Sequence, residues 1–222
     1  MSNPQSPFGR CKVLIVDDHP VVRHGLAQVI RAEPDLDVCG EAEDVAAALQ
    51  AVEATRPDVV IVDISLNGED GIELIDYLKS RQPAAKILVC SAHDEETFAG
   101  RVLRAGAAGY LSKREALCRI VEALHQVLRG EVYLSAQMTT HLLQRAAVGK
   151  PLDHDPVATL SNRELQVFHM IGEGMTTCEI ARKLAISPKT VESHRKVIKT
   201  KLDLQTSAQL SRRAFQWIQE GH

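Results

Sequence analysis

Four short apolar runs in this chain each end next to residues that carry a charge or a hydroxyl group. Near-continuous runs of valine, isoleucine and leucine are typical of parallel strands that are buried on both faces. The carboxyl ends of parallel strands lie at one edge of the sheet, so we expect these polar residues to gather there. The runs and their polar residues are 13–16 with Asp17 and Asp18, 59–62 with Asp63, 87–90 with Ser91, and 108–111 with Lys113.

The three carboxylates expected at this edge, Asp17, Asp18 and Asp63, limit its chemistry. Carboxylates that are brought together repel one another and are stable mainly when a cation joins them. A site with only oxygen ligands suits Mg²⁺. Taken alone, Asp17 and Asp18 could cap a helix, Asp63 could be a turn residue, and Lys113 could be a solvated lysine. The whole set, with Ser91 and Lys113 added, favours a site that handles a phosphoryl group.

Strands and helices alternate from residue 12 to about residue 130. Five strand–helix units in succession predict an α/β fold, a doubly wound five-stranded parallel sheet with helices on both faces. The strands are expected at 12–16, 37–39, 58–62, 86–90 and 108–111, and the helices near 20–33, 44–55, 70–80, 95–104 and 114–129. We therefore predict a first domain over residues 10–130.

The pattern changes after residue 130. A short helix is expected at 135–147, with Leu142 and Leu143 as its apolar positions. The stretch 148–156 contains one glycine and two prolines, which is typical of a linker. We therefore predict a linker with a short helix over residues 131–155.

Residues 156–220 carry start signals for helices and no pattern of strands. Capping boxes, in which Ser or Thr precedes Glu or Gln by three residues, begin at Ser161, Thr176 and Thr206. Ser187 stands before Pro188, a residue favoured at the first position of a helix. Four helices with a very short link between the second and third predict a small all-α helix-turn-helix domain.

Composition and charge are those of a folded protein with two dissimilar parts. Hydrophobic residues make up 45% of the 222 residues, and the chain lacks the roughly 18 consecutive apolar residues of a membrane span. Residues 1–10 lack the apolar core of a signal peptide, so we expect a cytoplasmic protein without a membrane partner. Residues 1–150 hold 16 Lys and Arg against 21 Asp and Glu, whereas residues 151–222 hold 10 against 8. The positive balance of the second part permits binding to nucleic acid.

The polar residues that follow the strands of the first domain, taken in their order along the chain, resemble those of the receiver domain of two-component response regulators. That domain has a flavodoxin-like fold. The matching elements are Val-Asp17-Asp18-His, Asp63 with Gly71 eight residues later, Ser91-Ala, and Gly109-Tyr110-Leu-Ser-Lys113. The resemblance implies that Asp63 is phosphorylated as an acyl phosphate. It also implies that Mg²⁺ is held by Asp18, Asp63 and the main-chain carbonyl of Ser65, while Asp17 acts largely through a bound water.

The same resemblance implies a phosphoryl-contacting and switching set. Lys113 would pair with a phosphoryl oxygen and Ser91 would donate its hydroxyl to the attached group. If Ser91 swings toward that group, it leaves space for the ring of Tyr110 to turn inward. An ordinary packed aromatic is the alternative for Tyr110.

The chain departs from the receiver pattern at a few places near the site. Leu66 and Asn67 stand where the family commonly has Met-Pro, and Arg114 stands where a cis-proline often follows the lysine. These changes affect loop geometry and phosphoryl lifetime, because no reactive group is lost. Ser65 and His93, two residues after Asp63 and Ser91, could border the path of an attacking water. We therefore expect substitutions at Ser65 or His93 to alter dephosphorylation.

The second domain resembles the LuxR-type helix-turn-helix of the NarL/FixJ family. The match covers Leu160-Ser-Asn-Arg-Glu164, Gly174-Met-Thr-Thr-Cys-Glu-Ile-Ala181, and Ile186-Ser-Pro-Lys-Thr-Val191 with His194, Ile198 and Leu202. Val191, Ile198 and Leu202 form one apolar stripe of the third helix, so its polar faces are free to enter a major groove. We assign base edges to Glu192, Ser193 and Lys196, and phosphates to Lys189, Thr190, Arg195 and Lys199.

Together the two resemblances imply a non-enzymatic response regulator of the NarL/FixJ type. A sensor histidine kinase would phosphorylate Asp63, and phosphorylation would control formation of a homodimer and binding to double-stranded promoter DNA. The last helix, expected at 206–219, carries Leu210, Ala214, Trp217 and Ile218, which suit core packing and are also compatible with a dimer contact.

Three other functions remain as alternatives. A phosphotransfer enzyme of the haloacid-dehalogenase type needs a second Asp two residues after the nucleophile, where this chain has Ser65. A LuxR-type sensor of small molecules needs an apolar ligand pocket in the first domain, which the acidic cluster disfavours. A DNA-binding regulator that works without phosphorylation is disfavoured by the complete set of site residues and stays open.

Overall fold

The structure is a computed structural model that describes residues 10–66, 69–147 and 156–219. The chain divides into two compact units, Met1–Thr140 and His141–His222. Within the described ranges, no helix combines the length and the apolar character that crossing a membrane requires.

A parallel sheet forms the centre of the first unit. Its five strands in the described part of the chain lie in the order β2-β1-β3-β6-β7. These strands are β1 (Cys11–Val16), β2 (Leu36–Ala42), β3 (Val59–Val62), β6 (Lys86–Ser91) and β7 (Gly109–Ser112). Val16 pairs with Val62 and Val62 pairs with Val89, so the residues that follow these strands begin side by side. The predicted α/β fold with a five-stranded parallel sheet is confirmed.

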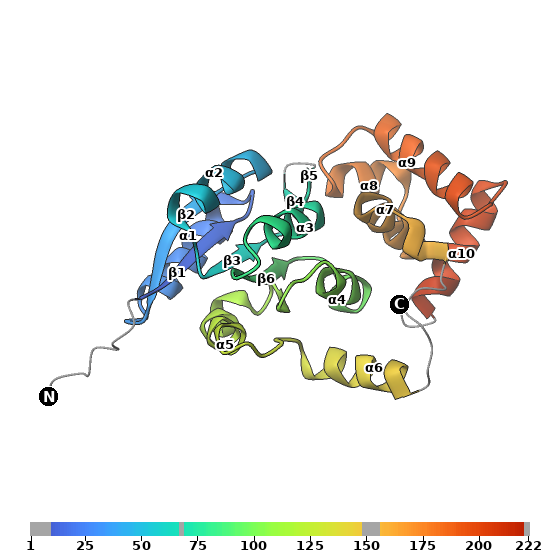
Figure 1. Ribbon diagram of the computed structural model, residues 1–222. Helices are drawn as coiled ribbons and strands as arrows, with labels where there is room; N and C mark the ends of the chain where they lie inside the picture. The colour runs from blue at the N-terminus through green and yellow to red at the C-terminus, as the bar shows by residue number, and fades with distance from the viewer. Residues whose placement is uncertain (1–9, 67–68, 148–155, 220–222) are drawn as a thin grey trace, which may run out of the picture. The chain divides into compact units, whose positions relative to one another are not determined.

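Helices cover both faces of this sheet (Figure 1). On one face, α1 (Pro20–Arg31) and α5 (Ala116–Leu128) pack on alternate strand residues such as Val13, Ile61 and Leu88. The other helices of the alternating pattern are α2 (Val45–Thr55), α3 (Gly71–Arg81) and α4 (Glu95–Arg104). Strand residues are buried on both sides, which explains why the apolar runs are nearly continuous.

Two small features of the first unit are not predicted by the sequence. The chain after Asp63 forms a short antiparallel pair of β4 (Ser65–Leu66) with β5 (Glu69–Asp70). In addition, β2 is longer than the expected strand at 37–39 and has an irregularity opposite Val13/Leu14 of β1. Strand propensity missed both features because glutamate, aspartate and glycine are poor strand formers.

The first part of the predicted linker is bound to the first unit. Tyr133 lies beside Gly109 in β7, and a Cβ on Gly109 would come within 2.6 Å of the Tyr133 carbonyl oxygen. The Ser135 amide donates to Glu95 Oε1 of α4 at 2.9 Å. Met138 in α6 (Ala136–Ala147) is buried as well. The predicted linker residues 148–155 lie outside the described residues.

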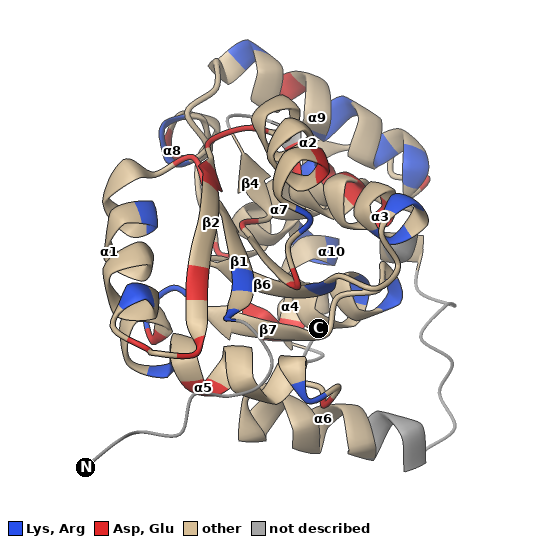
Figure 2. Cartoon of the chain, turned by 60° about the vertical axis from the view of Figure 1, so that its left-hand side comes forward, with Lys and Arg blue, Asp and Glu red and all other residues tan. Residues whose placement is uncertain are grey.

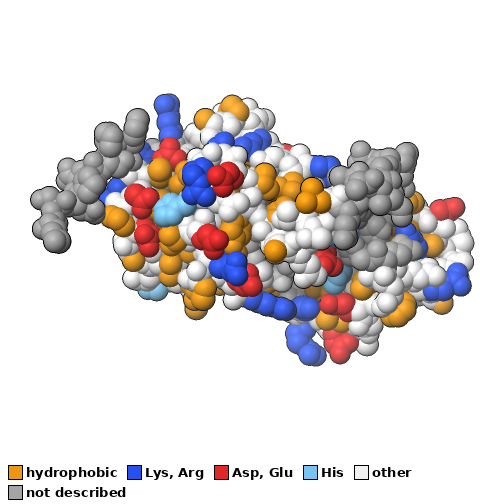
Figure 3. All heavy atoms as spheres, turned by 90° about the horizontal axis from the view of Figure 1, so that it is seen from below, with side chains coloured by type: hydrophobic (Ala, Val, Ile, Leu, Met, Phe, Trp, Pro, Cys, Tyr) orange, Lys and Arg blue, Asp and Glu red, His pale blue; other side chains and the backbone are white. Residues whose placement is uncertain are grey.

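The surface near α5 and α6 mixes apolar and charged side chains when it is seen from below (Figure 3). Large apolar residues are exposed in α5 at Leu117, in the following loop at Val132, and in α6 at Leu143. Scattered residues of this kind are usual on protein surfaces.

The second unit is helical, as the capping signals predict. It contains a short 3₁₀ turn at Pro156–Thr159 and then α7 (Asn162–Gly172), α8 (Thr177–Lys183), α9 (Pro188–Lys201) and α10 (Ser207–Gln219). Capping boxes close the starts of α7 and α8, and Ser187 caps α9. The helix-turn-helix prediction is therefore confirmed.

The core of the second unit gathers around α7. Phe168 lies edge-on to Trp217 of α10, with ring centroids 5.8 Å apart. Gly172 lets the two helices approach closely, because a Cβ there would lie 2.7 Å from the Ala214 carbonyl oxygen. Leu210, Ala214 and Trp217 are all buried, so these three residues of α10 serve the core.

Candidate functional site

The carboxyl end of the sheet holds one lysine between two carboxylates. Lys113 Nζ lies 2.6 Å from Asp17 Oδ2 and 2.6 Å from Asp63 Oδ2. Burial alone would lower the pKa of Lys113, but the carboxylates of Asp63 and Asp17 raise it above its usual value. Burial raises the pKa of Asp17, against the opposing effect of its hydrogen bonds from Lys113 and the His19 amide. Lys113 therefore stays charged beside Asp63.

Four potential metal ligands meet at the same edge. Asp17, Asp18, His19 and Asp63 each offer one atom, and these atoms lie within 4.8 Å of one another. Asp63 Oδ1 is buried and has no hydrogen-bond partner among the described residues. Leaving a buried charged oxygen without a partner is costly, so this atom favours a ligand that brings positive charge. The oxygen-rich set fits Mg²⁺.

Two residues that were not among the predicted site residues, His19 and Arg23, hold Asp17 in place. His19 donates its amide to Asp17 Oδ1 at 2.9 Å and brings its imidazole against the Asp18 carboxylate. Arg23 Nη1 of α1 donates to the main-chain oxygen of Asp17 at 2.6 Å. Their only sequence signal is proximity to Asp17 and Asp18, because the contacts depend on how α1 begins.

Gly71 brings the start of α3 onto the backbone of Asp63. The Gly71 amide donates to the Ile64 carbonyl at 2.9 Å. A Cβ at this position would lie 2.1 Å from the Asp63 carbonyl oxygen and 2.8 Å from Ile64 Cα. Steric exclusion therefore requires glycine here, and this close approach fixes the loop that carries Asp63.

The predicted switch residues Ser91 and Tyr110 are both connected to His93. The Tyr110 hydroxyl donates to the His93 carbonyl at 2.8 Å, and Ser91 Oγ accepts from the His93 amide at 3.3 Å. Burial raises the pKa of Tyr110 well above its usual value, so its hydroxyl remains a donor. The resemblance to receiver domains implies that the Tyr110 ring turns inward after Ser91 moves. In the structure the ring is inward and buried while Ser91 holds the His93 amide.

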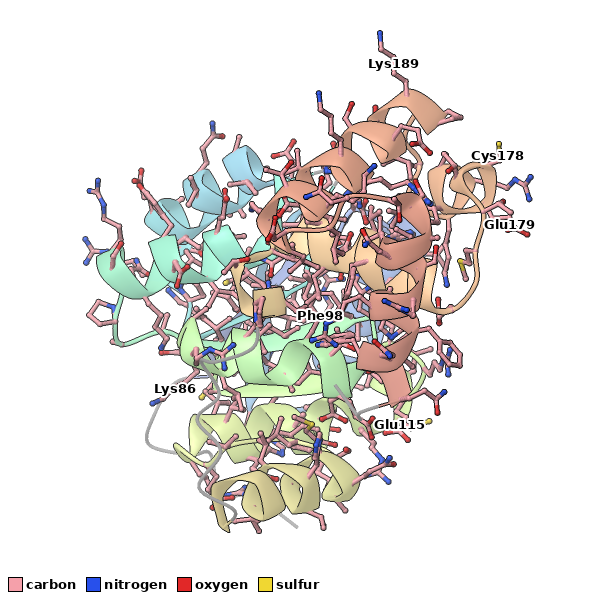
Figure 4. All side chains as sticks on the ribbon, turned by 90° about the vertical axis from the view of Figure 1, so that its right-hand side faces the viewer. Lys86, Phe98, Glu115, Cys178, Glu179 and Lys189 are labelled. Atoms are coloured by element: carbon pink, nitrogen blue, oxygen red, sulfur yellow. The ribbon has the colours of Figure 1, made fainter. Side chains whose placement is uncertain are left out.

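In the second unit, lysine and arginine recur along α9 (Figure 2). Lys189 points away from its helix into open space (Figure 4). Thr190, Glu192, Ser193 and Lys196 are exposed as well, whereas Val191 and Ile198 are buried in the core. The predicted division of α9 into a core stripe and an outer face agrees with these exposures.

Some assigned DNA contacts have partners within the unit. Thr177 Oγ1 of α8 donates to Glu192 Oε1 at 2.7 Å, and Arg195 Nε lies 3.6 Å from the same oxygen. The Arg195 side chain is only 14% exposed. Val197 was not assigned, yet it is exposed on the same helix. The individual DNA contacts stay predictions.

Comparison with known families agrees with both halves of this architecture. A family model described as response regulator receiver domain matches residues 13–125, and one described as bacterial regulatory proteins, luxR family, matches residues 158–214. The chain belongs to the response regulators with a LuxR-type DNA-binding domain. This response regulator is therefore of the NarL/FixJ type, a family that regulates transcription.

Relatives of this response regulator match along most of their length. The oxygen regulatory protein NreC of Staphylococcus haemolyticus is 37% identical over 204 residues, which cover 90% of this chain and 94% of that protein. The RcsB response regulator of Salmonella typhimurium is 28% identical, with a TM-score of 0.62 over 94% of this chain and 98% of that one. RcsB of Salmonella enterica serovar Typhimurium bound to promoter rprA has a TM-score of 0.59 at 28% identity, covering 92% of this chain and 98% of that one.

Proposed function

We propose that a sensor histidine kinase phosphorylates Asp63 and that the phosphorylated protein binds promoter DNA as a homodimer. In the transfer, a carboxylate oxygen of Asp63 bonds to phosphorus while the bond from phosphorus to the donor nitrogen breaks. The observation that carries this proposal is the difference between the two Asp63 oxygens: Oδ1 is buried without a hydrogen-bond partner among the described residues, and Oδ2 lies 2.6 Å from Lys113 Nζ. Oδ1 would face the cation, and Oδ2 would accept the phosphoryl group as Lys113 moves to a phosphoryl oxygen.

The surrounding residues support this role. Asp18, Asp63 and the carbonyl of Ser65 would hold Mg²⁺, with Asp17 acting largely through water. When bound, the ion offsets the repulsion between these carboxylates and an incoming phosphoryl group. Lys113 would move from the carboxylates to a phosphoryl oxygen.

The switch is proposed to run through Ser91 and Tyr110. Ser91 would exchange its hydrogen bond with the His93 amide for one to the phosphoryl group. The Tyr110 hydroxyl donates to the His93 carbonyl at 2.8 Å, so the Tyr110 ring would shift when His93 moves. The resulting form would pair with a second copy.

The proposed DNA interface is the outer face of α9. Its residues are Lys189, Thr190, Glu192, Ser193, Arg195, Lys196 and Lys199. RcsB dimers have been observed on DNA, and RcsB has been observed on promoters in the presence of a phosphomimetic. Two copies on an inverted repeat gain effective concentration, which supports the proposed homodimer. We propose a cytoplasmic location because bacterial promoter DNA lies there.

We expect the full chain to bind its promoter more tightly after treatment with a small phosphodonor and Mg²⁺. The isolated fragment 150–222 should bind without phosphorylation, because the receiver that controls it is missing. Fluorescence anisotropy of labelled promoter DNA at one fixed salt concentration measures both. A full chain that binds equally well with and without the donor, and as tightly as the fragment, would contradict receiver-controlled binding.

Glu192 and Lys199 should have different effects on DNA recognition. Glu192→Ala should relax preference at one base position, since a base contact contributes about 1–3 kcal/mol of discrimination. Lys199→Ala should weaken binding to all sequences and lower the salt slope by about one. Binding of a promoter library at several salt concentrations separates the two effects. If Glu192→Ala leaves every base preference intact, Glu192 does not read a base and serves only to bind Thr177 and Arg195 within the domain.

A further inference from the structure

Two adjacent side chains in the first turn of α7 bond to the chain on either side of the reading face of α9. Glu164 Oε2 accepts from Lys201 Nζ at 2.7 Å, and Lys201 is the last residue of α9. Arg163 Nη2 donates at 2.8 Å to the carbonyl of Leu184, the C-cap of α8, in the link that leads into α9. The start of α7 therefore holds both the entry and the end of the helix proposed to read DNA.

The ammonium group of Lys201 is turned into the second unit. It donates to the Thr159 carbonyl at 3.2 Å as well as to Glu164. Glu164 is 7% exposed and also accepts from the Ser161 amide at 2.7 Å, as part of the capping box of α7. Burial alone would raise the pKa of Glu164, but the hydrogen bonds from Lys201 and the Ser161 amide hold it below its usual value. A charged Glu164 therefore pairs with Lys201.

Arg163 supports the link between α8 and α9. Its other terminal nitrogen, Nη1, donates to Gln166 Oε1 at 2.9 Å, so the guanidinium group is fixed at two points. The residue after Leu184, Ala185, has a φ of 53°, a conformation that residues other than glycine rarely adopt. The bond from Arg163 to the Leu184 carbonyl therefore stabilises a turn that local backbone preference disfavours.

Apolar packing alone does not fix the direction of α9. Val191 and Ile198 bury one side of the helix in the core, but hydrophobic attraction has no preferred direction. The 14 residues of α9 make it about 20 Å long, so a small tilt at one end displaces the side chains at the other. Hydrogen bonds to base edges weaken steeply when they are misaligned. Polar contacts near both ends therefore keep the reading side chains aligned with the bases.

We propose that Arg163 and Glu164 form a two-point clamp that orients α9 for base recognition, with Lys201 as an internal partner of the clamp and not a phosphate contact. This inference rests on the proposed DNA interface of α9. Arg163, Glu164 and Lys201 act as positioning residues, because they set the direction of α9 and touch no base. The clamp should govern discrimination between sequences and leave the electrostatic part of the affinity unchanged.

A phosphate contact and a clamp residue have different effects on DNA binding. A lysine that neutralises one phosphate contributes about one to the slope of log affinity against log salt concentration. Loss of the Lys201 charge should leave this slope unchanged. It should weaken binding to a preferred sequence about three- to tenfold, because base contacts become misaligned, and change binding to a scrambled sequence less than about twofold.

The test uses the full chain treated with acetyl phosphate and Mg²⁺. The wild type first selects a preferred duplex from a random library, and a scrambled duplex of the same length is the reference. Fluorescence anisotropy at several salt concentrations gives both affinities and the salt slope. The variants are Lys201→Met, Arg163→Met and the double variant Glu164→Gln with Lys201→Met. The double variant keeps the net charge of the chain and should lose as much discrimination as Lys201→Met, since both changes remove one bond.

Four controls accompany these variants. Lys201→Arg keeps a charged donor for Glu164 and should restore most of the discrimination. Lys183→Met makes the same change on α8, where the side chain is 54% exposed, and should preserve discrimination. Lys199→Ala should lower the salt slope by about one. Trp217 is the single tryptophan of the chain and is buried in the core of the second unit, so its fluorescence during denaturation shows whether that unit is folded in each variant.

Lost discrimination in folded Lys201→Met and Arg163→Met, at an unchanged salt slope, supports the clamp. A slope that falls by about one in Lys201→Met, with both duplexes weakened equally, would make Lys201 a phosphate contact and overturn the clamp. Discrimination that survives in either variant also overturns it. If Lys201→Met unfolds, Lys201→Gln, which keeps a neutral donor, decides the question by the same measurements. A selection that enriches no sequence would instead refute the proposed DNA interface, so the two failures are distinguishable.

Discussion

Asp63→Asn should take up no phosphoryl group under conditions that label the wild type fully. The amide nitrogen and oxygen of asparagine are poor nucleophiles, and the charge that pairs with Lys113 is lost. Intact-protein mass spectrometry after incubation with acetyl phosphate and Mg²⁺ measures the result. Removing Mg²⁺ with a chelator should also abolish labelling of the wild type, because the carboxylates Asp17, Asp18 and Asp63 then repel the donor.

Asp76→Asn is the matched control for this experiment. Asp76 is exposed on α3, so its loss should leave labelling unchanged. Labelling of Asp63→Asn to the wild-type extent would show that another side chain is the acceptor. Labelling that persists in full without a divalent cation would contradict the assignment of the metal ligands.

Gly71→Ala should damage both the stability of the first unit and the rate of phosphorylation. The new Cβ would lie 2.1 Å from the Asp63 carbonyl oxygen, so the acceptor loop or the start of α3 has to move. Overpacking of this kind costs about 1–3 kcal/mol of unfolding free energy. Displacement of a reacting group by about 1 Å can slow a reaction about a hundredfold, so labelling should slow by about tenfold or more.

Chemical denaturation and the time course of labelling measure these two effects. Gly100→Ala is the control, because a Cβ at Gly100 in α4 meets only Arg104 Nη1 at 3.8 Å. Alanine is also the better helix former, so this variant should be as stable as the wild type or slightly more so. If Gly71→Ala labels at the wild-type rate, the close approach to Asp63 does not position the acceptor.

Much of the fold follows from local sequence signals. Continuous apolar runs predict buried parallel strands, and the residues after them necessarily share one edge of the sheet. These two rules predict that Asp17, Asp63 and Lys113 lie together, and Lys113 Nζ is 2.6 Å from a carboxylate oxygen of each aspartate. The helical starts at Ser161, Thr176 and Ser187 are equally local, because each cap bonds to an amide three residues away.

Contacts between distant loops were beyond sequence reasoning. The sequence placed Ser65 and His93 near the acceptor, yet no periodicity shows that Ser65 Oγ lies 2.8 Å from His93 Nε2. The inward ring of Tyr110 and the contact of Arg23 with the Asp17 carbonyl depend in the same way on tertiary packing. The pattern of charge that assigns Arg195 to a phosphate does not reveal that Arg195 Nε also lies 3.6 Å from Glu192 Oε1.

The hydrogen bonds between Tyr133 and β7 determine how a displacement of this strand is transmitted to the chain that follows the first unit. The Tyr110 amide donates to the Tyr133 carbonyl at 2.8 Å, and the Tyr133 amide donates to the Ala108 carbonyl at 3.0 Å. Any backbone displacement at Tyr110 must therefore carry Tyr133 with it or break this bond. The segment before α6 is thus hydrogen-bonded to β7, the strand that carries Tyr110. A displacement of β7 is therefore transmitted through the main chain to the start of α6.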